Sequence, residues 1–304
     1  MSSAFGVARR CRGVARWVAV CGLVVATVPE AIAVRGGRSQ PDGAGPGFSL
    51  RFYGHGQDGI DRVVVPLDGR PVNVGQNLTI EFWMRANGND NASPACQEGG
   101  DGWIFGNILI DRDVFGPGDL GDFGVSLGGG RIAFGVAVGA AAQTICSDTP
   151  IADDTWHHLA LTRAADGRLR IFVDGQPSGD GRGAPGDISY RSGRSTPYGA
   201  DPTLVFGAEK HDAGSEYPSF NGWLDEVRIS STVRYTVPFT PARVPFSPDG
   251  QTVALYHFDE GPAGPCRGDL VDSSAATGGG GAECRHGGSA PAGPEFSSDT
   301  PMER

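Results

Sequence analysis

The chain has few basic residues, and nearly all of them are arginine. Of its 304 residues, 25 are basic and 35 are acidic, which gives a formal net charge of −10, and Lys210 is the only lysine. An acidic chain repels the phosphates of nucleic acids and anionic membrane surfaces. Nucleic acid and anionic lipid are therefore excluded as general electrostatic partners.

The sequence also lacks an apolar run long enough to span a membrane comfortably. Its N-terminal run, Trp17 to Val28, is too short for a transmembrane helix. Four arginines precede this run and the small-residue motif Ala-Ile-Ala follows it, an order typical of a secretory signal peptide. We therefore predict a signal peptide over residues 1–33, a flexible leader over residues 34–47 and a secreted mature chain. A lipoprotein signal ending at Cys21 is the alternative.

Cysteines are few, and their spacing does not support a zinc site. Removal of residues 1–33 leaves four cysteines and a net charge of −13. No CxxC or HxxxH spacing accompanies these cysteines, and an even number in an oxidising compartment indicates two disulfides. Among the three possible pairings we favour Cys96 with Cys146 and Cys266 with Cys284, because each pair would then staple a glycine-rich region with few core residues.

Long helices are disfavoured by frequent chain breaks, since the chain contains 49 glycines and 22 prolines. Alternating segments recur instead. In segment 78–86 the even-numbered residues from Leu78 to Met84 would form one apolar face. Strands without intervening helices predict an all-β fold, an antiparallel two-sheet β-sandwich. The expected strands are 48–53, 61–65, 78–86, 103–111, 122–127, 131–138, 156–163, 168–173, 203–207, 222–229 and 252–258.

Three long connections separate or follow the expected strands, at residues 87–102, 174–202 and 259–304. Binding residues of β-sandwiches often lie on such loops, although this composition is more often that of a tolerated insertion. The glycine-rich segment 261–304 is interpreted as a C-terminal extension that contains one disulfide and packs on the sandwich or trails from it. Segment 252–258 is expected to complete the sandwich.

Five motifs follow one another along the chain, and they are Ser49–Gly54 with Asp61–Pro66, Leu78–Met84, Asp154–Ala160, Leu169–Gly175 and Phe220–Ser230. Together they are similar to the laminin G-like jelly-roll domain (LamG-like) of the concanavalin A-like lectin/glucanase superfamily, over roughly residues 48–258. The resemblance implies a single domain over residues 48–260 that acts as a non-catalytic binding or adhesion module. Carbohydrate is the favoured ligand, and recognition of a surface protein is the alternative.

The resemblance also implies a structural calcium ion where the first strand pair approaches the last strand. Asp58, Asp61 and Asp225 supply the hard oxygen ligands that calcium needs. Alternatively, Asp58 and Asp61 form turns and Asp225 accepts hydrogen bonds from the backbone. In a regular strand Asp225 would share one face with Val227, and Glu226 would point to the other face.

Catalysis is not expected, because the chain lacks the ExDxxE strand that places two acids on one face in catalytic members of the superfamily. A glycoside hydrolase or lyase is the second alternative. The adjacent His157 and His158 should diverge along a strand, so packing is favoured over a metal or acid–base role. Glu81, Trp83 and Arg85, on the outer face of segment 78–86, are the candidates for a sugar-stacking surface.

Overall fold

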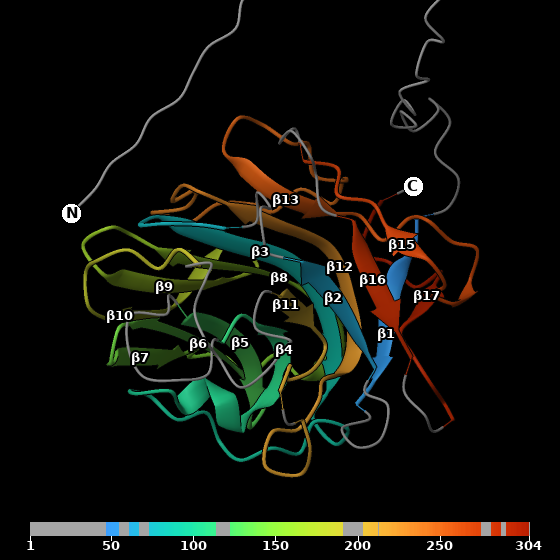
Figure 1. The fold of residues 1–304 in the computed structure, drawn as a ribbon, viewed down its shortest axis with the longest axis horizontal. Coiled ribbons are helices and arrows are strands. Elements are labelled where there is room, and N and C mark those ends of the chain that lie inside the picture. The colour runs from blue at the N-terminus through green and yellow to red at the C-terminus, as the bar shows by residue number, and fades with distance from the viewer. Residues whose placement is uncertain are drawn as a thin grey trace, which may run out of the picture. The chain divides into compact units, whose positions relative to one another are not determined.

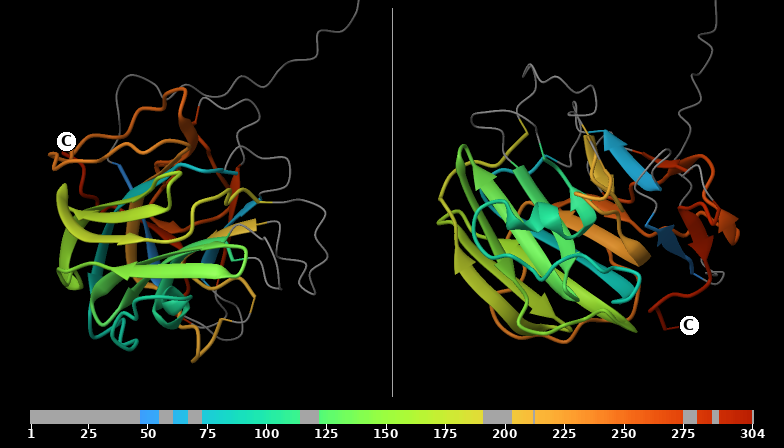
Figure 2. Two further views of the ribbon diagram at one scale, coloured as in Figure 1. Left: turned by 90° about the vertical axis from the view of Figure 1, so that its left-hand side faces the viewer. Right: turned by 90° about the horizontal axis from the view of Figure 1, so that it is seen from below.

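The computed structural model of the chain describes residues 47–54, 61–66, 73–113, 122–190, 203–211, 213–274, 281–286 and 290–303. These residues form two antiparallel β-sheets packed face to face (Figure 1, Figure 2). The predicted all-β sandwich is therefore confirmed. Within the described residues, the short 3₁₀ turn η1 (Gly102–Phe105) is the one helical element, and no helix is long and apolar enough to cross a membrane. The expected signal peptide lies outside the described residues.

The first sheet follows the order β10-β9-β8-β3-β12-β1-β17-β14, and β13 also pairs with β12. Strand β8 pairs antiparallel with β3 on one side and with β9, its hairpin partner, on the other. Its strands are β1 (Ser49–Tyr53), β3 (Leu78–Asn87), β8 (Asp153–Arg163), β9 (Arg168–Val173), β10 (Gln176–Arg182), β12 (Asn221–Ser230), β13 (Thr252–Tyr256), β14 (Gly264–Pro265) and β17 (Glu295–Ser297).

The second sheet follows the order β15-β16-β2-β11-β4-β5-β6-β7. Strands β4 to β7 form an antiparallel meander in chain order. Its strands are β2 (Arg62–Pro66), β4 (Asn107–Asp111), β5 (Asp122–Gly128), β6 (Arg131–Val138), β7 (Ala141–Cys146), β11 (Thr203–Phe206), β15 (Asp269–Leu270) and β16 (Ala282–Arg285).

The hydrophobic core lies between the sheets. As predicted, the even-numbered residues from Leu78 to Met84 point into it, and all of them are fully buried. Phe123 and Phe134 enter the same cluster from the second sheet. Each such side chain stabilises the fold by about 1.5–3 kcal/mol relative to an exposed position.

The C-terminal part of the chain contributes strands to both sheets. Strand β13 pairs with β12, as expected for segment 252–258. After residue 260, β14 and β17 join the first sheet, whereas β15 and β16 join the second. A disulfide joins Cys266, directly after β14, to Cys284 in β16, so it links the two sheets. Both disulfide pairings favoured from the sequence are confirmed.

Some elements differ from the prediction. The expected strand 103–111 begins with the turn η1, and only its second half forms β4. Strands β7 and β10 were not predicted. Strand β10 (Gln176–Arg182) has the sequence QPSGDGR, which carries no large apolar side chain. A neighbouring strand supplies the hydrogen bonds that order it. Its pairing therefore depends on β9 and not on its own composition.

The outer face of the first sheet is covered by residues 231–250, which we call the covering segment. This segment has no regular secondary structure. The rings of Phe239 and Phe246 lie 5.6 and 6.0 Å from the ring of His158 in β8, both edge-on. The ring of Tyr235 stacks on Phe239 at 3.7 Å. The first sheet is therefore buried on both faces in this region.

Candidate functional site

The sugar-stacking surface expected at Glu81, Trp83 and Arg85 is not exposed. Glu81 is 0 % exposed and Trp83 is 2 % exposed. The guanidinium of Arg243, from the covering segment, lies 5.0 Å from the centroid of the Trp83 ring. The prediction is therefore wrong for Glu81 and Trp83, because the covering segment occupies the face on which a sugar would lie. Arg85 reaches the surface but forms ion pairs with Asp154 and Asp299.

Glu81 has a structural role beneath this cover. Its carboxylate accepts a hydrogen bond from Arg228 Nε at 2.8 Å and another from the Tyr235 hydroxyl at 2.7 Å. Burial raises the pKa of this carboxyl group, but the contact with His158 Nε2 at 3.7 Å and the hydrogen bond from Arg228 outweigh that effect and lower the pKa below its usual value. Glu81 therefore anchors the covering segment as a buried, ionised carboxylate.

Strand β12 contains a β-bulge that changes the expected pattern of its faces. The register with β3 shifts between Asp225 and Arg228, and Glu226 adopts a positive φ of 51°. As a result Val227 lies in the core with Leu224, whereas Asp225 lies opposite Trp83 on the outer side. The expectation that Asp225 and Val227 share one face was therefore wrong.

Asp225 and Glu226 are both directed to the segments that cover the outer face, which corrects the prediction that they point to opposite faces. Asp225 accepts a hydrogen bond from the Thr300 hydroxyl at 2.7 Å. Glu226 accepts one from the Phe246 backbone N–H at 2.7 Å, and its other oxygen lies 2.8 Å from His257 Nδ1. Burial, and then the charge of Glu226, raise the pKa of Asp225 well above its usual value. Both acids are about 1 % exposed, so this pair offers no open catalytic site.

The expected calcium ligands do not converge within the described residues. The Tyr53 backbone N–H lies 3.3 Å from Asp61 Oδ2, whereas Asp225 directly follows Leu224, the partner of Leu50. Leu50 and Tyr53 are three strand residues apart, roughly 10 Å, so one ion with ligands at about 2.3–2.6 Å would not reach both acids. Asp58 lies outside the described residues. Calcium binding itself stays a prediction.

The two neighbouring histidines diverge, as the strand period predicts. His158 is buried beneath the covering segment. His157 is held at the surface between two carboxylates, with Nδ1 2.7 Å from Asp174 and Nε2 3.1 Å from Asp153. Its two ring nitrogens therefore face different acids, an arrangement that orients the ring and does not converge on a single point.

A groove of about 650 Å³ lies beside the second sheet, between two loops. Its volume is within the range of about 300–1,000 Å³ that is usual for small-ligand sites. Phe105 is 42 % exposed at this groove, and Tyr217 is half-buried on the other wall. Amide, hydroxyl and carboxylate groups accompany the two rings. The lining residues are Ala92, Ser93, Pro94, Gln97, Phe105, Asn107, Ser215, Glu216, Tyr217 and Pro218.

One residue joins the two walls of the groove. The side chain of Asn107, at the start of β4, donates a hydrogen bond to the Ser219 carbonyl at 2.8 Å. Its oxygen accepts a hydrogen bond from the Ser93 backbone N–H at 3.2 Å. Asn107 is 5 % exposed, so it sets the spacing of the walls and offers little surface to a ligand.

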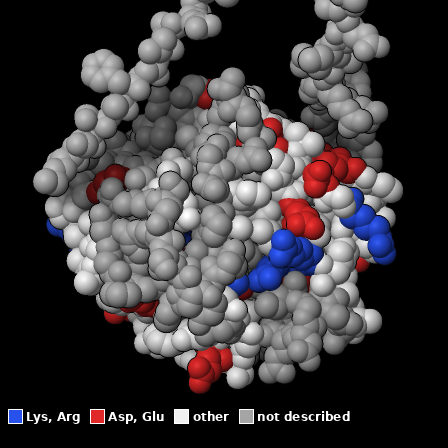
Figure 3. Space-filling view, viewed as in Figure 1, with Lys and Arg blue, Asp and Glu red and all other residues white. Residues whose placement is uncertain are grey.

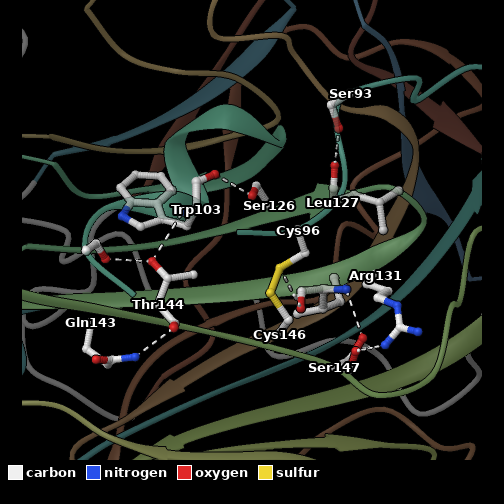
Figure 4. Close-up of a disulfide and its surroundings, with 12 residues drawn as sticks. Ser93, Cys96, Trp103, Ser126, Leu127, Arg131, Gln143, Thr144, Cys146 and Ser147 are labelled. Carbon is white, nitrogen blue, oxygen red and sulfur yellow. Dashed lines mark hydrogen bonds between the residues drawn. A yellow bond between two sulfur atoms is a disulfide. The ribbon is translucent and has the colours of Figure 1, made fainter. Parts of the chain in front are cut away.

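The wall formed by residues 92–107 is fixed by covalent and polar contacts (Figure 4). The Cys96–Cys146 disulfide joins this wall to the end of β7. The Ser93 hydroxyl donates to the Leu127 carbonyl at 2.7 Å, and the Thr144 hydroxyl accepts from the Trp103 backbone N–H at 3.2 Å. The long connection 87–102 is therefore held to the second sheet at several points.

Trp103 is the hydrophobic anchor of this wall. Its side chain is 3 % exposed and belongs to a small cluster with Ile108 and Ala133, separate from the main core. Figure 4 shows its indole above the strands that carry Ser126 and Thr144. The ring packs on Gly124 and Gly135, where an added Cβ would come within about 2 Å of it. No local pattern in the sequence predicts this packing.

A second, smaller hollow adjoins the groove. It has a volume of about 300 Å³ and shares Ala92 and Ser93 with the groove. Gly129, Gly130 and Asp153 line its other side. The segment around Ser93 therefore separates two neighbouring depressions on the same edge of the molecule.

Charges of both signs occur together on the described surface. Figure 3 shows acidic and basic side chains in adjacent groups on the face viewed in Figure 1. Arginines form ion pairs with carboxylates, for example Arg234 with Asp249 at 2.8 Å and Arg168 with Asp180 at 2.6 Å. These arginines are thus paired with acids on a chain whose net charge is negative. Neither property supports nucleic-acid binding.

Comparison with known families agrees with this architecture. Residues 58–235 match a laminin G family model described as the concanavalin A-like lectin/glucanases superfamily. The match spans more than half of the chain, from the segment before β2 to the start of the covering segment. The chain therefore belongs to this superfamily, as its five motifs predicted.

Solved structures with a similar fold have low sequence identity to this chain. A candidate carbohydrate-binding protein of Bacteroides ovatus is 15% identical (TM-score 0.49) and covers 79% of this chain, which spans only 58% of that protein. A heptameric SAP-like pentraxin from Limulus polyphemus is 15% identical (TM-score 0.42), with 62% of this chain and 78% of that one covered. Domains LG4-5 of the mouse laminin alpha1 chain are 16% identical (TM-score 0.41), with 66% and 47% covered.

Proposed function

We propose that this protein is a secreted, non-catalytic binding module that recognises carbohydrate in the groove between Phe105 and Tyr217. The observation that carries the proposal is the pairing of these two aromatic side chains, on opposite walls of one groove, with amide and hydroxyl groups. Aromatic rings pack against the C–H faces of sugars, and a few placed polar groups orient the hydroxyls.

The rigidity of the groove supports the same proposal. The Cys96–Cys146 disulfide and the Asn107 hydrogen bonds fix the walls before a ligand arrives. A preformed site loses less conformational entropy on binding, so more of the contact energy appears as affinity. The two disulfides also suit a protein exported to an oxidising compartment.

Catalysis receives no support from the described acids. Asp225 and Glu226 are enclosed by the covering segment and by the C-terminal residues around Thr300. Glycoside hydrolysis needs two carboxylates that face a sugar-sized cleft. Among the described residues that line the groove, Glu216 is the single carboxylate, so we assign it to ligand orientation.

A glycan array followed by calorimetry with the best ligand tests the proposal. Phe105→Ala and Tyr217→Ala should each weaken binding about 10-fold, because an aromatic contact contributes roughly 1 kcal/mol or more beyond its buried area. Val237→Ala is the matched control, because Val237 is 65 % exposed on the covering segment. This control should leave the affinity unchanged.

Two results would overturn the proposal. One is an array with no bound glycan, which would favour recognition of a surface protein by this module. The other is a bound glycan whose affinity survives the Phe105→Ala, Tyr217→Ala double variant, which would place the site elsewhere on the molecule. Circular dichroism of each variant separates loss of binding from loss of fold.

A further inference from the structure

Three potential metal ligands of mixed chemistry converge at the end of β4. Asp113 follows this strand, and Glu209 and His211 lie in the connection after β11. One ligand atom from each residue lies within 4.8 Å of the other two. His211 Nδ1 is 3.2 Å from Glu209 Oε1 and 3.7 Å from Asp113 Oδ2. Within the described ranges, this is the single group of three such ligands at so close a spacing.

A buried carboxylate holds the two backbone segments that carry these ligands. Asp111 Oδ1 accepts a hydrogen bond from the Asp113 backbone N–H at 2.6 Å, and Oδ2 accepts one from the Lys210 backbone N–H at 2.9 Å. Asp111 is also the β-sheet partner of Val205 in β11. The positions of Asp113 on one segment, and of Glu209 and His211 on the other, are therefore set by one fully buried side chain.

Two of the three ligand side chains are buried and the third is partly exposed, so an ion could reach the group from solvent. The side chains of His211 and Glu209 are 3 % and 8 % exposed, whereas that of Asp113 is 33 % exposed. The group is thus enclosed on two sides and open to solvent beside Asp113. The second oxygen of Glu209 accepts a hydrogen bond from the His211 backbone N–H at 2.5 Å, which orients the carboxylate toward the imidazole.

We propose that Asp113, Glu209 and His211 bind one divalent transition-metal ion of the zinc type. Zinc takes four ligands from imidazole nitrogen and carboxylate oxygen, and three protein ligands leave one position for water or another group. Calcium is disfavoured because it prefers six to eight oxygen ligands, and this group presents a ring nitrogen. The ion would bridge the second sheet to the β11–β12 connection and restrain that connection.

The metal proposal is independent of the carbohydrate proposal. The groove is lined by Asn107, the first residue of β4, whereas the metal ligand Asp113 follows Asp111, the last residue of that strand. Both sites use the connection between β11 and β12, but they share no residue. Failure of glycan binding would therefore leave the metal proposal intact, and the reverse also holds.

The test uses untagged, chelator-treated protein and measures Zn²⁺ binding by calorimetry and by the shift in melting temperature. One equivalent of Zn²⁺ should bind and raise the melting temperature, since a ligand that binds only the folded state stabilises it. His211→Gln should weaken Zn²⁺ binding by about 100-fold or more, because loss of an outer-shell partner alone costs about 10- to 100-fold. Asp113→Asn, at a more exposed position, provides a second variant that is less apt to disturb folding.

His157→Gln is the matched control, because His157 also contacts two carboxylates. Those carboxylates lie on opposite ring nitrogens, so they cannot hold one ion together with the imidazole. This variant should bind Zn²⁺ as the unmodified protein does. Absence of stoichiometric Zn²⁺ binding, or equal affinity in His211→Gln, would overturn the proposal and leave a histidine–carboxylate ion pair only. Preferential binding of Ca²⁺ at this group would overturn its assignment to the zinc class.

Discussion

Gly124 of β5 and Gly135 of β6 are direct cross-strand partners, and the indole of Trp103 occupies the space above both. A Cβ at position 124 would lie 2.1 Å from Trp103 Cζ3, and one at position 135 would lie 1.9 Å from Trp103 Cδ1. Contacts this short force the ring to move. The wall of the groove that contains Phe105 therefore depends on two glycines beneath Trp103.

The first prediction follows from this packing. Gly135→Ala should reduce the free energy of unfolding by about 1–3 kcal/mol, the usual cost of overpacking, and should weaken glycan binding because η1 is displaced. Denaturant unfolding and calorimetry measure the two effects. Gly250→Ala is the control, since an added methyl there meets nothing within 4 Å. Unchanged stability and affinity in Gly135→Ala would show that Trp103 does not position the groove.

The second prediction compares the two disulfides. Replacing Cys96 and Cys146 with serine removes a cross-link over 50 residues, and the chain-entropy model then predicts a loss of about 4 kcal/mol. The same change at Cys266 and Cys284 removes one over 18 residues, for a predicted loss of about 3 kcal/mol. Only the first pair holds a wall of the groove, so only the first change should reduce glycan affinity. Equal effects of both pairs on affinity would contradict this.

The fold class was predictable because it depends on local periodicity. The alternation in segment 78–86 identifies β3 and its core face from Leu78 to Met84, and the structure buries those residues between the sheets. The five family motifs fall on strands in the predicted order, apart from short shifts at the ends. Both disulfide pairings were also predicted, because each would staple a glycine-rich region with few core residues.

The candidate site was not predictable to the same degree, because nonlocal contacts decide it. Burial of Trp83 depends on Arg243, which is 160 positions away and lies in a segment without any pattern. The bulge at Glu226 inverts the faces of β12 after Asp225, and nothing in the local sequence marks it. The groove requires Phe105 and Tyr217 to line the same hollow from two different loops, a proximity that the spacing of residues in a single sequence does not encode.

The third prediction concerns the attachment of the C-terminal segment. Asp299 accepts a hydrogen bond from the Trp156 indole N–H at 2.9 Å and pairs with Arg85, and its backbone carbonyl accepts one from the Ser49 hydroxyl at 2.6 Å. Asp299→Ala should lower the free energy of unfolding by about 1 kcal/mol, because the partly screened ion pair with Arg85 and the hydrogen bond from the Trp156 indole to the carboxylate are lost, whereas the backbone carbonyl keeps its bond from Ser49.

Glu283→Ala is the control for that change, because Glu283 pairs with Arg285 on the open surface. It should leave the unfolding midpoint in denaturant unchanged. If Asp299→Ala is also without effect, the contacts of Asp299 do not hold the C-terminal segment on the first sheet.

The fourth prediction is a pH dependence with a defined sign. Asp225 ionises near pH 3.9 in the unfolded chain, but burial and the neighbouring charges of Glu226 and Asp259 raise its pKa in the folded protein. The folded state therefore binds more protons between these two values, so stability falls as the pH rises through that interval, by up to about 1.4 kcal/mol per pH unit. Asp225→Asn removes this loss and should gain stability relative to the unmodified protein between pH 4 and neutral pH, in denaturant titrations at several pH values.

Asp249 provides a control of opposite sign. Its hydrogen bond from Arg234 outweighs its slight burial and lowers its pKa below the usual value. Its contribution to stability is therefore present above the unfolded pKa and is lost as the pH falls below it. Asp249→Asn should be less stable than the unmodified protein at neutral pH, and the difference should shrink in acid. If Asp225→Asn showed this same trend, the Asp225 carboxylate would have to be stabilised in its charged form beside Thr300, which contradicts a raised pKa.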